Sequence, residues 1–361
     1  MGSEFLSNIY MMASFSLIGS FFITLYLIPK IIWVVNSNDL IDKPDDRSAH
    51  KNSTPTMGGF AFFLTLVFSI FFIKIWDVEA VGLNFIAAIT LIFAVGLKDD
   101  LVLTSPRAKL VSEVIAILFI LFLNGFQVNS LEGFLGINNI SPWLSYSLIV
   151  LLILTIINAY NLIDGIDGLA SVIGIVVFSF YGLIFFVAGL YFYFLVSLIL
   201  IGILSAFLRF NFSSSQKIFM GDTGSLIIGF CMGFLSLKFL AMDSLLLSEY
   251  SFVAENKLII IGGILFIPLF DTFRVIGIRL LNNKSPFYPD RNHIHHILID
   301  LEYSHIKASL FLGFLNLILI DLLSILSLYF NSYQMFGFLI VVFILMLGLF
   351  YKLKSSVKKK E

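Results

Sequence analysis

The chain has 361 residues, of which 59% are hydrophobic and only 12% are charged. An average soluble domain carries about 25% charged residues, so this composition excludes soluble globular and disordered proteins. The 22 basic residues are matched by 23 acidic ones, and this balance excludes a nucleic-acid-binding protein. The composition therefore predicts an all-α, polytopic integral membrane protein.

Residues 1–5 read Met-Gly-Ser-Glu-Phe, which we interpret as a cloning scar. The first apolar run, about 9–35, is longer than a signal peptide and lacks an Ala-x-Ala cleavage site, so it is expected to cross the membrane. A crossing helix needs roughly 20 apolar residues. Eleven such runs lie near 9–35, 58–76, 81–97, 110–128, 143–159, 171–187, 190–208, 223–241, 257–279, 309–330 and 333–352.

The basic residues indicate the orientation of the chain. Eleven spans put the two termini on opposite sides of the membrane. With a cytoplasmic C-terminus, only Lys74, Lys238 and Lys257 of the 22 basic residues fall at outer ends, as the positive-inside rule requires. We therefore expect one transmembrane domain over residues 6–352 and a basic cytoplasmic tail over residues 353–361, with the reactive residue types on the cytoplasmic side.

The first inner loop, about 36–57, contains Arg47, His50 and Lys51, which could hold a phosphate. Gly58 and Gly59 follow it and permit the backbone to approach a neighbouring segment or a ligand closely. A solvated loop before a helix start remains the alternative interpretation.

Two adjacent carboxylates, Asp99 and Asp100, lie at the end of an apolar helix. Charge placed there is costly unless it meets water, a cation or a partner, and Mg²⁺ prefers carboxylate oxygens. The alternative is an interfacial helix cap. Downstream, Arg107 and Lys109 are either further phosphate partners or merely follow the positive-inside rule.

The next inner loop carries four polar residues at spacing three: Asn158, Asn161, Asp164 and Asp167. If this segment is helical, they lie along one face, and the glycines that follow the two aspartates expose backbone N–H groups. Two carboxylates and two amides next to a membrane span have little structural purpose. This segment is therefore the strongest candidate for a chemical role.

Asp222 stands between two glycines just before the eighth span, at the expected N-terminus of a helix. This position suits a role in metal or phosphate binding, and a simple N-cap is the alternative.

The last inner loop follows an apolar helix and combines arginines with histidines. A His-x-His-His string could suggest zinc, but with no cysteine nearby we favour phosphate binding. His305 stands apart and is interpreted as a loop residue. The candidates of this loop and its helix are Asp271, Arg274, Arg279, Arg291, His293, His295 and His296.

This inventory fits phosphoryl chemistry, in which carboxylates hold Mg²⁺, the metal neutralises a diphosphate, and cationic side chains bind the remaining phosphate oxygens. No Gly-x-x-x-x-Gly-Lys-Ser/Thr loop is present, so ATP hydrolysis is not supported. A membrane-embedded site of this kind indicates one lipid phosphate substrate and one soluble nucleotide. A transporter of nucleotide sugar or lipid-linked sugar and a non-catalytic membrane scaffold are the alternatives.

The motifs resemble those of the polyprenyl-phosphate N-acetylhexosamine-1-phosphate transferases, the family that includes WecA, TagO and MraY. The specific strings are Asn-Ala-Tyr-Asn-Leu-Ile-Asp-Gly-Ile-Asp-Gly-Leu-Ala over 158–170 and Phe-Met-Gly-Asp-Thr-Gly-Ser over 219–225. The string over 54–59 and the pair Asp99-Asp100 also match. In the string over 290–296, Ile294 interrupts the three consecutive histidines of MraY, so the WecA/TagO type is the better match.

The resemblance implies an enzyme that transfers HexNAc-1-phosphate, by default GlcNAc-1-phosphate, from a UDP-sugar to undecaprenyl phosphate and releases UMP. It also implies a bacterial cytoplasmic membrane location, Mg²⁺ (or Mn²⁺) as cofactor, and a homodimer. The hexosamine and the surface polymer served (O-antigen, teichoic acid or capsule) stay open, as does a covalent intermediate.

The resemblance further implies a role for each matching residue. The expected metal ligands are Asp222, Asp99 and Asp100. The expected catalytic residues are Asp99, Asp100, Asp164, Asp167, His293, His295 and His296. The expected substrate-binding residues are Lys51, Lys109, Asn158, Asn161, Arg274, Arg279 and Arg291.

Overall fold

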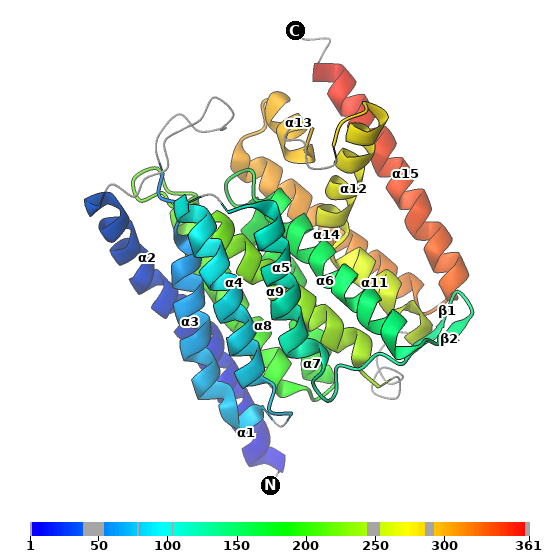
Figure 1. Cartoon of the computed structure of the whole chain (residues 1–361), viewed down its shortest axis with the longest axis horizontal. Coiled ribbons are helices and arrows are strands. Elements are labelled where there is room, and N and C mark those ends of the chain that lie inside the picture. The colour runs from blue at the N-terminus through cyan, green and yellow to red at the C-terminus, as the bar shows by residue number, and fades with distance from the viewer. Residues whose placement is uncertain are drawn as a thin grey trace.

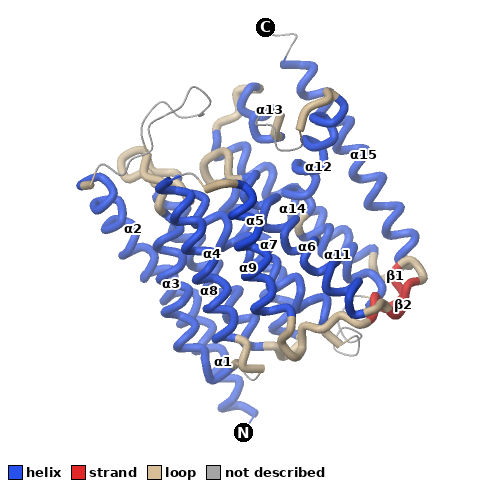
Figure 2. Tube along the Cα trace, in the orientation of Figure 1, coloured by secondary structure: helices blue, strands red, loops and turns tan. Residues whose placement is uncertain are grey.

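The computed structural model describes residues 2–38, 54–77, 79–102, 104–243, 253–285 and 292–357, with the backbone alone for residues 2–7. It is a bundle of helices with one small β-hairpin at its edge (Figures 1 and 2). The first half comprises α1 (Gly2–Ser14), a π-helical turn η1 (Phe15–Gly19), α2 (Ser20–Ser37), α3 (Gly58–Ile73), a 3₁₀ turn η2 (Lys74–Trp76), α4 (Gly82–Val102), α5 (Pro106–Leu121), β1 (Ser130–Phe134), β2 (Ile137–Asn139) and α6 (Pro142–Ile163). The second half comprises α7 (Leu169–Val187), α8 (Tyr191–Asn211), α9 (Gly221–Ala241), a 3₁₀ turn η3 (Ala254–Asn256), α11 (Lys257–Ile264), α12 (Phe266–Leu281), α13 (Ile294–Asp300), α14 (His305–Leu326) and α15 (Ser332–Val357).

The polytopic all-α fold predicted from composition is confirmed. Among the described residues, eight helices are long and apolar enough to cross a membrane, and the bent pair α11–α12 makes up to nine. Helices α4 and α5 coincide with the two remaining apolar runs of the sequence. The count of eleven crossings stays a prediction.

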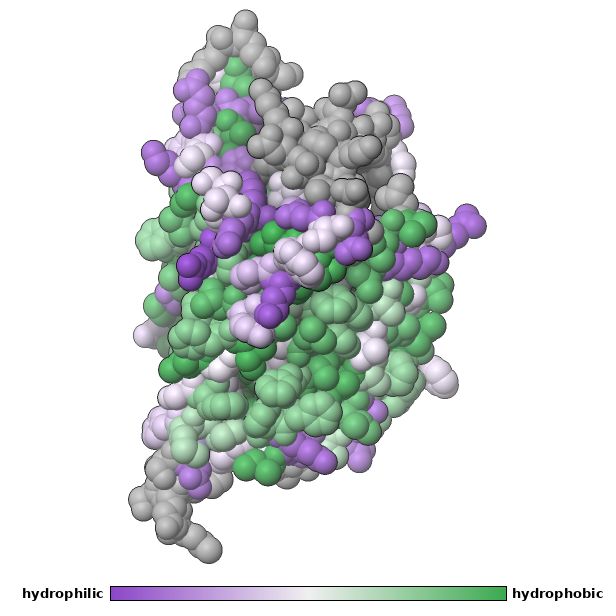
Figure 3. Space-filling view, turned by 90° about the vertical axis from the view of Figure 1, so that its left-hand side faces the viewer, coloured by the Kyte–Doolittle hydropathy of each residue, from purple (hydrophilic) through white to green (hydrophobic). Residues whose placement is uncertain are grey.

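The bundle has two distinct ends. Helix α1 begins at the lower end in Figure 1, and α15 finishes at the upper end, so the chain starts and ends on opposite sides as an odd number of spans requires. The hairpin β1–β2 lies at the lower end and α13 at the upper end. In the side view of Figure 3, hydrophobic side chains form a band between hydrophilic residues at the two ends, which is the surface pattern of a membrane-spanning protein.

Helix α9 forms the centre of the bundle and packs against α6, α4 and α3. Of the residues in its most apolar stretch, 94% are buried. This burial is possible because glycines on the neighbouring helices let the backbones approach closely. A Cβ atom added to Gly59 of α3 would lie 2.2 Å from the Gly224 nitrogen, and one added to Gly96 of α4 would lie 2.5 Å from the Thr223 Cα. The close approach that Gly59 permits is thus to α9, and the one that Gly58 permits is to the Phe219 carbonyl just before α9.

The apolar run over 257–279 is divided rather than straight, since α11 and α12 meet at an angle of 71°. Pro268 has no N–H group to donate to the Ile264 carbonyl four residues earlier, and such a missing bond bends a helix. The side chain of Asn316 on α14 replaces the lost bonding. Its Nδ2 donates to the Ile264 carbonyl at 3.0 Å and its Oδ1 accepts from the Ile267 N–H at 3.3 Å.

Two lysines at the lower end are buried rather than exposed to solvent. The Lys238 ammonium lies 2.6 Å from Glu79 Oε1 and 4.9 Å from the centre of the Tyr193 ring. Lys257 donates to the Met242 carbonyl at 2.5 Å and lies 4.0 Å from Glu132. Both positive charges are compensated inside the protein, which explains why the sequence tolerates them at the outer end of the predicted topology.

Candidate active site

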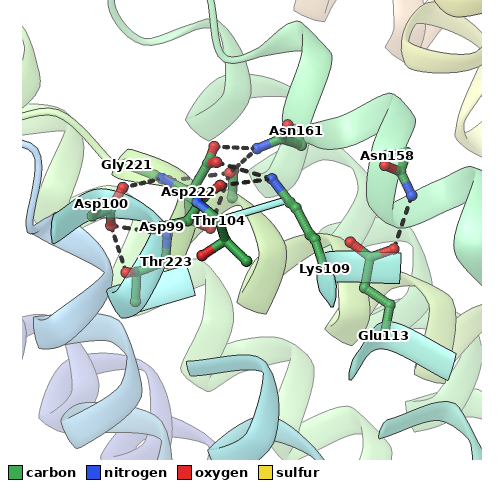
Figure 4. Close-up of polar contacts among 11 residues, drawn as sticks. Asp99, Asp100, Thr104, Lys109, Glu113, Asn158, Asn161, Gly221, Asp222 and Thr223 are labelled. Atoms are coloured by element: carbon green, nitrogen blue, oxygen red, sulfur yellow. Dashed lines mark hydrogen bonds and ion pairs between the residues drawn. The ribbon is translucent and has the colours of Figure 1, made fainter. Parts of the chain in front are cut away.

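Polar residues from four helices meet at the upper end of the bundle (Figure 4). Asp99 and Asp100 come from the last turns of α4, Lys109 from the first turn of α5, and Asn161 from the last turn of α6. Asp222 comes from the first turn of α9. Residues that are more than 100 positions apart in the chain therefore share one site, as the motifs predicted.

Asp222 is the centre of this cluster. Its Oδ2 lies 2.9 Å from the Lys109 ammonium, and its Oδ1 accepts a hydrogen bond from Asn161 Nδ2 at 2.7 Å. Asp99 Oδ2 lies 3.5 Å from the same ammonium, and Asp99 Oδ1 accepts from the Thr104 N–H. Two carboxylates from different helices thus share a single positive charge.

Asp100 faces the opposite way and caps the start of α9. Its Oδ1 accepts from the Asp222 N–H at 2.7 Å, and its Oδ2 accepts from the Thr223 N–H at 3.1 Å and from the Thr223 hydroxyl at 2.5 Å. A carboxylate at a helix N-terminus satisfies unpaired N–H groups and interacts favourably with the helix dipole. Of the paired aspartates, Asp99 therefore faces the shared cation, while Asp100 fixes the backbone that carries Asp222.

The segment before α3 lies against the segment before α9. The Gly58 N–H donates to the Phe219 carbonyl at 3.0 Å, the Gly59 N–H donates to the Met220 carbonyl at 3.0 Å, and the Phe219 N–H donates to the Pro55 carbonyl at 2.8 Å. The described part of the first-loop motif thus holds the approach to Asp222 by backbone hydrogen bonds. Arg47, His50 and Lys51 lie outside the described residues.

Asp164 follows the last residue of α6 and lies close enough to Asp100 and Asp222 for their charges to interact. Burial, and then the neighbouring negative charges, raise the pKa of this carboxyl from 3.8 to about 7. Asp164 is therefore near the point of ionisation at neutral pH, and a cation brought to the cluster would favour its charged form.

The raised pKa makes stability depend on pH. The folded protein holds the Asp164 proton more tightly than the unfolded chain, so this stabilisation is complete below pH 3.8 and is lost as the pH rises through about 7. We expect the melting temperature of the wild type, relative to Asp164→Asn, to fall between about pH 4 and about pH 7 and to level off above that. Thermal melts of both proteins in detergent with EDTA measure this. If the difference in melting temperature between the two proteins does not change with pH, the raised pKa of Asp164 is contradicted.

Asp167 faces a different set of partners. Its Oδ2 lies 2.7 Å from the Lys217 ammonium and 3.0 Å from His305 Nδ1. Burial alone would raise the pKa of this carboxyl, but the hydrogen bonds and charges of His305 and Lys217 outweigh it and lower the pKa. Helix α6 ends at Ile163, so the shared helix face expected if residues 158–167 were helical extends only to Asn158 and Asn161, and Asp164 and Asp167 lie beyond the helix end.

His305 is not an isolated loop residue, and that prediction is wrong. It is the first residue of α14, and the Ser309 hydroxyl one turn later donates to the Asp167 carbonyl at 2.7 Å. Together with the Lys217 ion pair, these contacts tie the 164–168 turn to α14 and to the segment before α9.

Asp271 of α12 positions the histidine loop, residues 293–296, through two contacts. Asp271 Oδ2 lies 2.8 Å from His293 Nδ1, and its Oδ1 accepts from the Ile294 N–H at 2.9 Å. Arg274 Nη2 lies 3.3 Å from Asp271 Oδ1 and also donates to the Asn292 carbonyl. In this structure Arg274 therefore fixes the histidine loop. Arg279 is buried on the same helix, and Arg291 lies outside the described residues.

His295 brings this loop to the Asp164 turn. A Cβ atom added to Gly165 would lie 2.2 Å from His295 Nε2, so only glycine leaves room for the ring. Burial lowers the pKa of His295 to about 3, and its Nδ1 has no hydrogen-bond partner among the described residues. The ring is therefore neutral and carries no positive charge. His296 lies beside it, with the two ring centres 4.4 Å apart.

Two charged residues of the site were missed by the sequence reasoning. Glu113 of α5 is 1% exposed and accepts from Asn158 Nδ2 at 3.0 Å. Lys217 is the partner of Asp167. A lone glutamate inside an apolar run is itself a signal, since ionisable residues in membrane helices mark functional positions. Lys217 has no such signal, because a basic residue in an inner loop is what the positive-inside rule predicts.

The donor set of the cluster suits a hard cation, because Asp99 and Asp222 present carboxylate oxygens to one shared positive charge. The Lys109 ammonium occupies that place, and within the described ranges no three acidic, histidine or cysteine side chains converge as metal ligands do. A metal ion would therefore have to displace the ammonium from its position between the two carboxylates.

The fold and this cluster define a polytopic membrane protein with an acidic site at one end of its helix bundle. The model of the glycosyl transferase family 4 matches residues 83–240. The chain is 30% identical over 311 residues to a probable undecaprenyl-phosphate N-acetylglucosaminyl 1-phosphate transferase of Bacillus subtilis, covering 85% of this chain and 82% of the relative.

Two further relatives carry the name undecaprenyl-phosphate alpha-N-acetylglucosaminyl 1-phosphate transferase. That of Pasteurella multocida is 30% identical over 335 residues, with 90% of this chain and 89% of the relative covered. That of Haemophilus influenzae is 28% identical over 335 residues, with 91% and 90% covered. The chain therefore belongs to the polyprenyl-phosphate N-acetylhexosamine-1-phosphate transferases of the WecA/TagO type, and it is a membrane transferase.

Proposed function

We propose that this protein transfers GlcNAc-1-phosphate from UDP-GlcNAc to undecaprenyl phosphate on the cytoplasmic side of a bacterial membrane, giving undecaprenyl-diphospho-GlcNAc and UMP. The names of the relatives support the lipid acceptor and the transferred group. The observation that carries the proposal is that the carboxylates of Asp99 and Asp222 converge on one positive charge, the Lys109 ammonium, at a single end of the bundle. A transporter is disfavoured, because its polar groups should lie near the middle of the membrane.

We assign the divalent cation to Asp222 and Asp99, whose carboxylates already face a positive charge. When bound there, Mg²⁺ supplies the charge that stabilises the diphosphate of the donor and the departing nucleotide phosphate. Asn161 fixes the orientation of Asp222 through its hydrogen bond. Asp100, predicted as a metal ligand, is assigned a positioning role instead, because its two oxygens accept three hydrogen bonds from the start of α9.

The histidine loop is the proposed binding site for the sugar or the diphosphate. His295, neutral and with Nδ1 unpartnered among the described residues, has a hydrogen bond available for a substrate hydroxyl or phosphate oxygen. His293 is held in place by Asp271, which fixes the ring through Nδ1. Asp167 acts by holding the turn that carries Asp164, through Lys217 and His305.

For the chemical step we favour direct attack of the lipid phosphate oxygen on the phosphorus that carries the sugar, with Asp99 orienting the acceptor. A phosphate monoester has a second pKa of about 6, so it is largely dianionic at neutral pH and needs no strong base. A covalent phospho-aspartate would instead give ping-pong kinetics and release of UMP without lipid acceptor.

The test is Mg²⁺-dependent release of UMP by the detergent-solubilised protein. We expect release only when UDP-GlcNAc, undecaprenyl phosphate and Mg²⁺ are all present, and its loss when EDTA removes the metal. A panel of UDP-N-acetylhexosamines, with GalNAc and N-acetylfucosamine included, then determines the sugar. No UMP with any donor would contradict the proposed reaction, and UMP without lipid would contradict direct attack.

A further inference from the structure

Glu113 is an unusually placed acid, because it lies within the apolar run 110–128 that the sequence predicts to cross the membrane. It lies on α5, whose other buried residues are apolar, and is 1% exposed. Its Oε2 accepts from Asn158 Nδ2 at 3.0 Å, while its Oε1 has no hydrogen-bond partner among the described residues. A buried carboxylate oxygen without a partner costs free energy, and a contact made in another state of the protein would offset this cost.

The position of Glu113 indicates which group makes that contact. Glu113 lies four residues after Lys109 on the same helix, and residues at this spacing are neighbours on one helix face. Figure 4 shows the two side chains on one side of α5, with Lys109 directed to Asp222 and Glu113 directed to Asn158. The charges of Lys109 and Glu113 are close enough to interact. The flexible lysine side chain therefore has two carboxylates near its ammonium, Asp222 and Glu113.

A divalent cation bound to Asp99 and Asp222 would repel the Lys109 ammonium from its position. The ammonium lies 2.9 Å from Asp222 Oδ2 and 3.5 Å from Asp99 Oδ2, in the place that the metal would take. The ammonium and the metal ion cannot share this place, since two positive charges repel each other strongly at such distances inside a protein. The metal therefore binds only if the ammonium leaves, and the ammonium leaves more readily if another carboxylate receives it.

We propose that Glu113 is a positioning residue that receives the Lys109 ammonium when a divalent cation binds to Asp99 and Asp222. The inference rests on the proposed function, because it requires the metal site assigned there. In the metal-free protein the Lys109 ammonium forms ion pairs with the carboxylates of Asp99 and Asp222. In the metal-bound protein the Lys109–Glu113 pair satisfies Oε1 and keeps the lysine charge beside the diphosphate site.

The test measures Mn²⁺ affinity by electron paramagnetic resonance, without substrate, in the wild type, Glu113→Gln, Lys109→Met and the double variant. We expect Glu113→Gln to weaken Mn²⁺ binding about tenfold, because the displaced ammonium has no anionic partner. In the Lys109→Met background, Glu113→Gln should change the Mn²⁺ affinity by less than about threefold, because the lysine through which Glu113 acts is absent. Lys109→Met alone should bind Mn²⁺ about tenfold more tightly.

An equal loss from Glu113→Gln in both backgrounds would overturn the inference, because it would show a general charge effect or a loss of the Asn158 contact. If Glu113→Gln does not give a monodisperse protein, Lys109→Met decides alone, and unchanged or weaker Mn²⁺ binding overturns the displacement. Glu79→Gln is the matched control, since Glu79 also pairs with a buried lysine, at the other end of the bundle. Failure of the wild type to bind Mn²⁺ would instead overturn the proposed metal site, and with it this inference.

Discussion

Replacing Asp222 by asparagine is expected to abolish turnover, with a fall in kcat/KM of about a thousandfold or more. Asparagine keeps the shape of the side chain and removes its charge. The Lys109 ammonium, 2.9 Å away, relies on that charge, as would a metal ion, and the hydrogen bond from Asn161 Nδ2, 2.7 Å away, loses its ionised acceptor. Initial rates of Mg²⁺-dependent UMP release measure the effect, with size-exclusion chromatography to verify folding.

Two control variants accompany this measurement. Asp321→Asn changes an exposed acid of α14, and Lys358→Ala changes the basic tail, so both should leave the rate near that of the wild type. If Asp222→Asn kept a rate within about tenfold of the wild type, the assignment of the metal to Asp222 would be wrong.

The second large effect is expected from Gly59→Ala, which should reduce the free energy of unfolding by about 2–3 kcal/mol. The added Cβ would lie 2.2 Å from the Gly224 nitrogen and 2.6 Å from the Gly224 Cα. Backbone cannot move aside as a flexible side chain can, so α3 would have to separate from α9. Because α9 carries Asp222, activity should fall with stability. Thermal melts in detergent, together with the UMP assay, measure both.

Gly348→Ala is the matched control for this substitution. A Cβ atom at Gly348 would meet nothing within 4 Å, and alanine is favoured over glycine inside a helix by about 1 kcal/mol. The melting temperature should therefore stay unchanged or rise. A Gly59→Ala protein as stable and active as the wild type would show that the α3–α9 contact is looser than the structure has it.

The acidic cluster could be predicted because its members are expensive residues in an apolar chain. Asp99, Asp164 and Asp222 each follow or precede an apolar run, where charge is rare unless it has a function. With an alternating topology, loops of the same side meet at one end of the bundle, so the sequence alone indicated that these carboxylates converge.

The division of roles within the cluster was not predictable from the sequence. Asp99 and Asp100 are adjacent and chemically identical, yet one faces Lys109 and the other caps α9. Consecutive residues near a helix end point in directions about 100° apart, so the packing of α4 against α9 decides which one reaches the cation. Likewise, the end of α6 at Ile163 turns Asp167 away from the cluster to Lys217 and His305.

Local properties of the chain were enough to establish the membrane class, the helices at the apolar runs and the family, because long apolar runs and short motifs of charged residues and glycine can be recognised without a fold. Which groups touch one another became known only from the packing of the helices. The pairing of Lys109 with Asp222 and the burial of Glu113 beside Asn158 depend on contacts between helices distant in sequence. Hydrogen bonds and ion pairs act over a few ångströms, so their partners are fixed by packing and not by position along the chain.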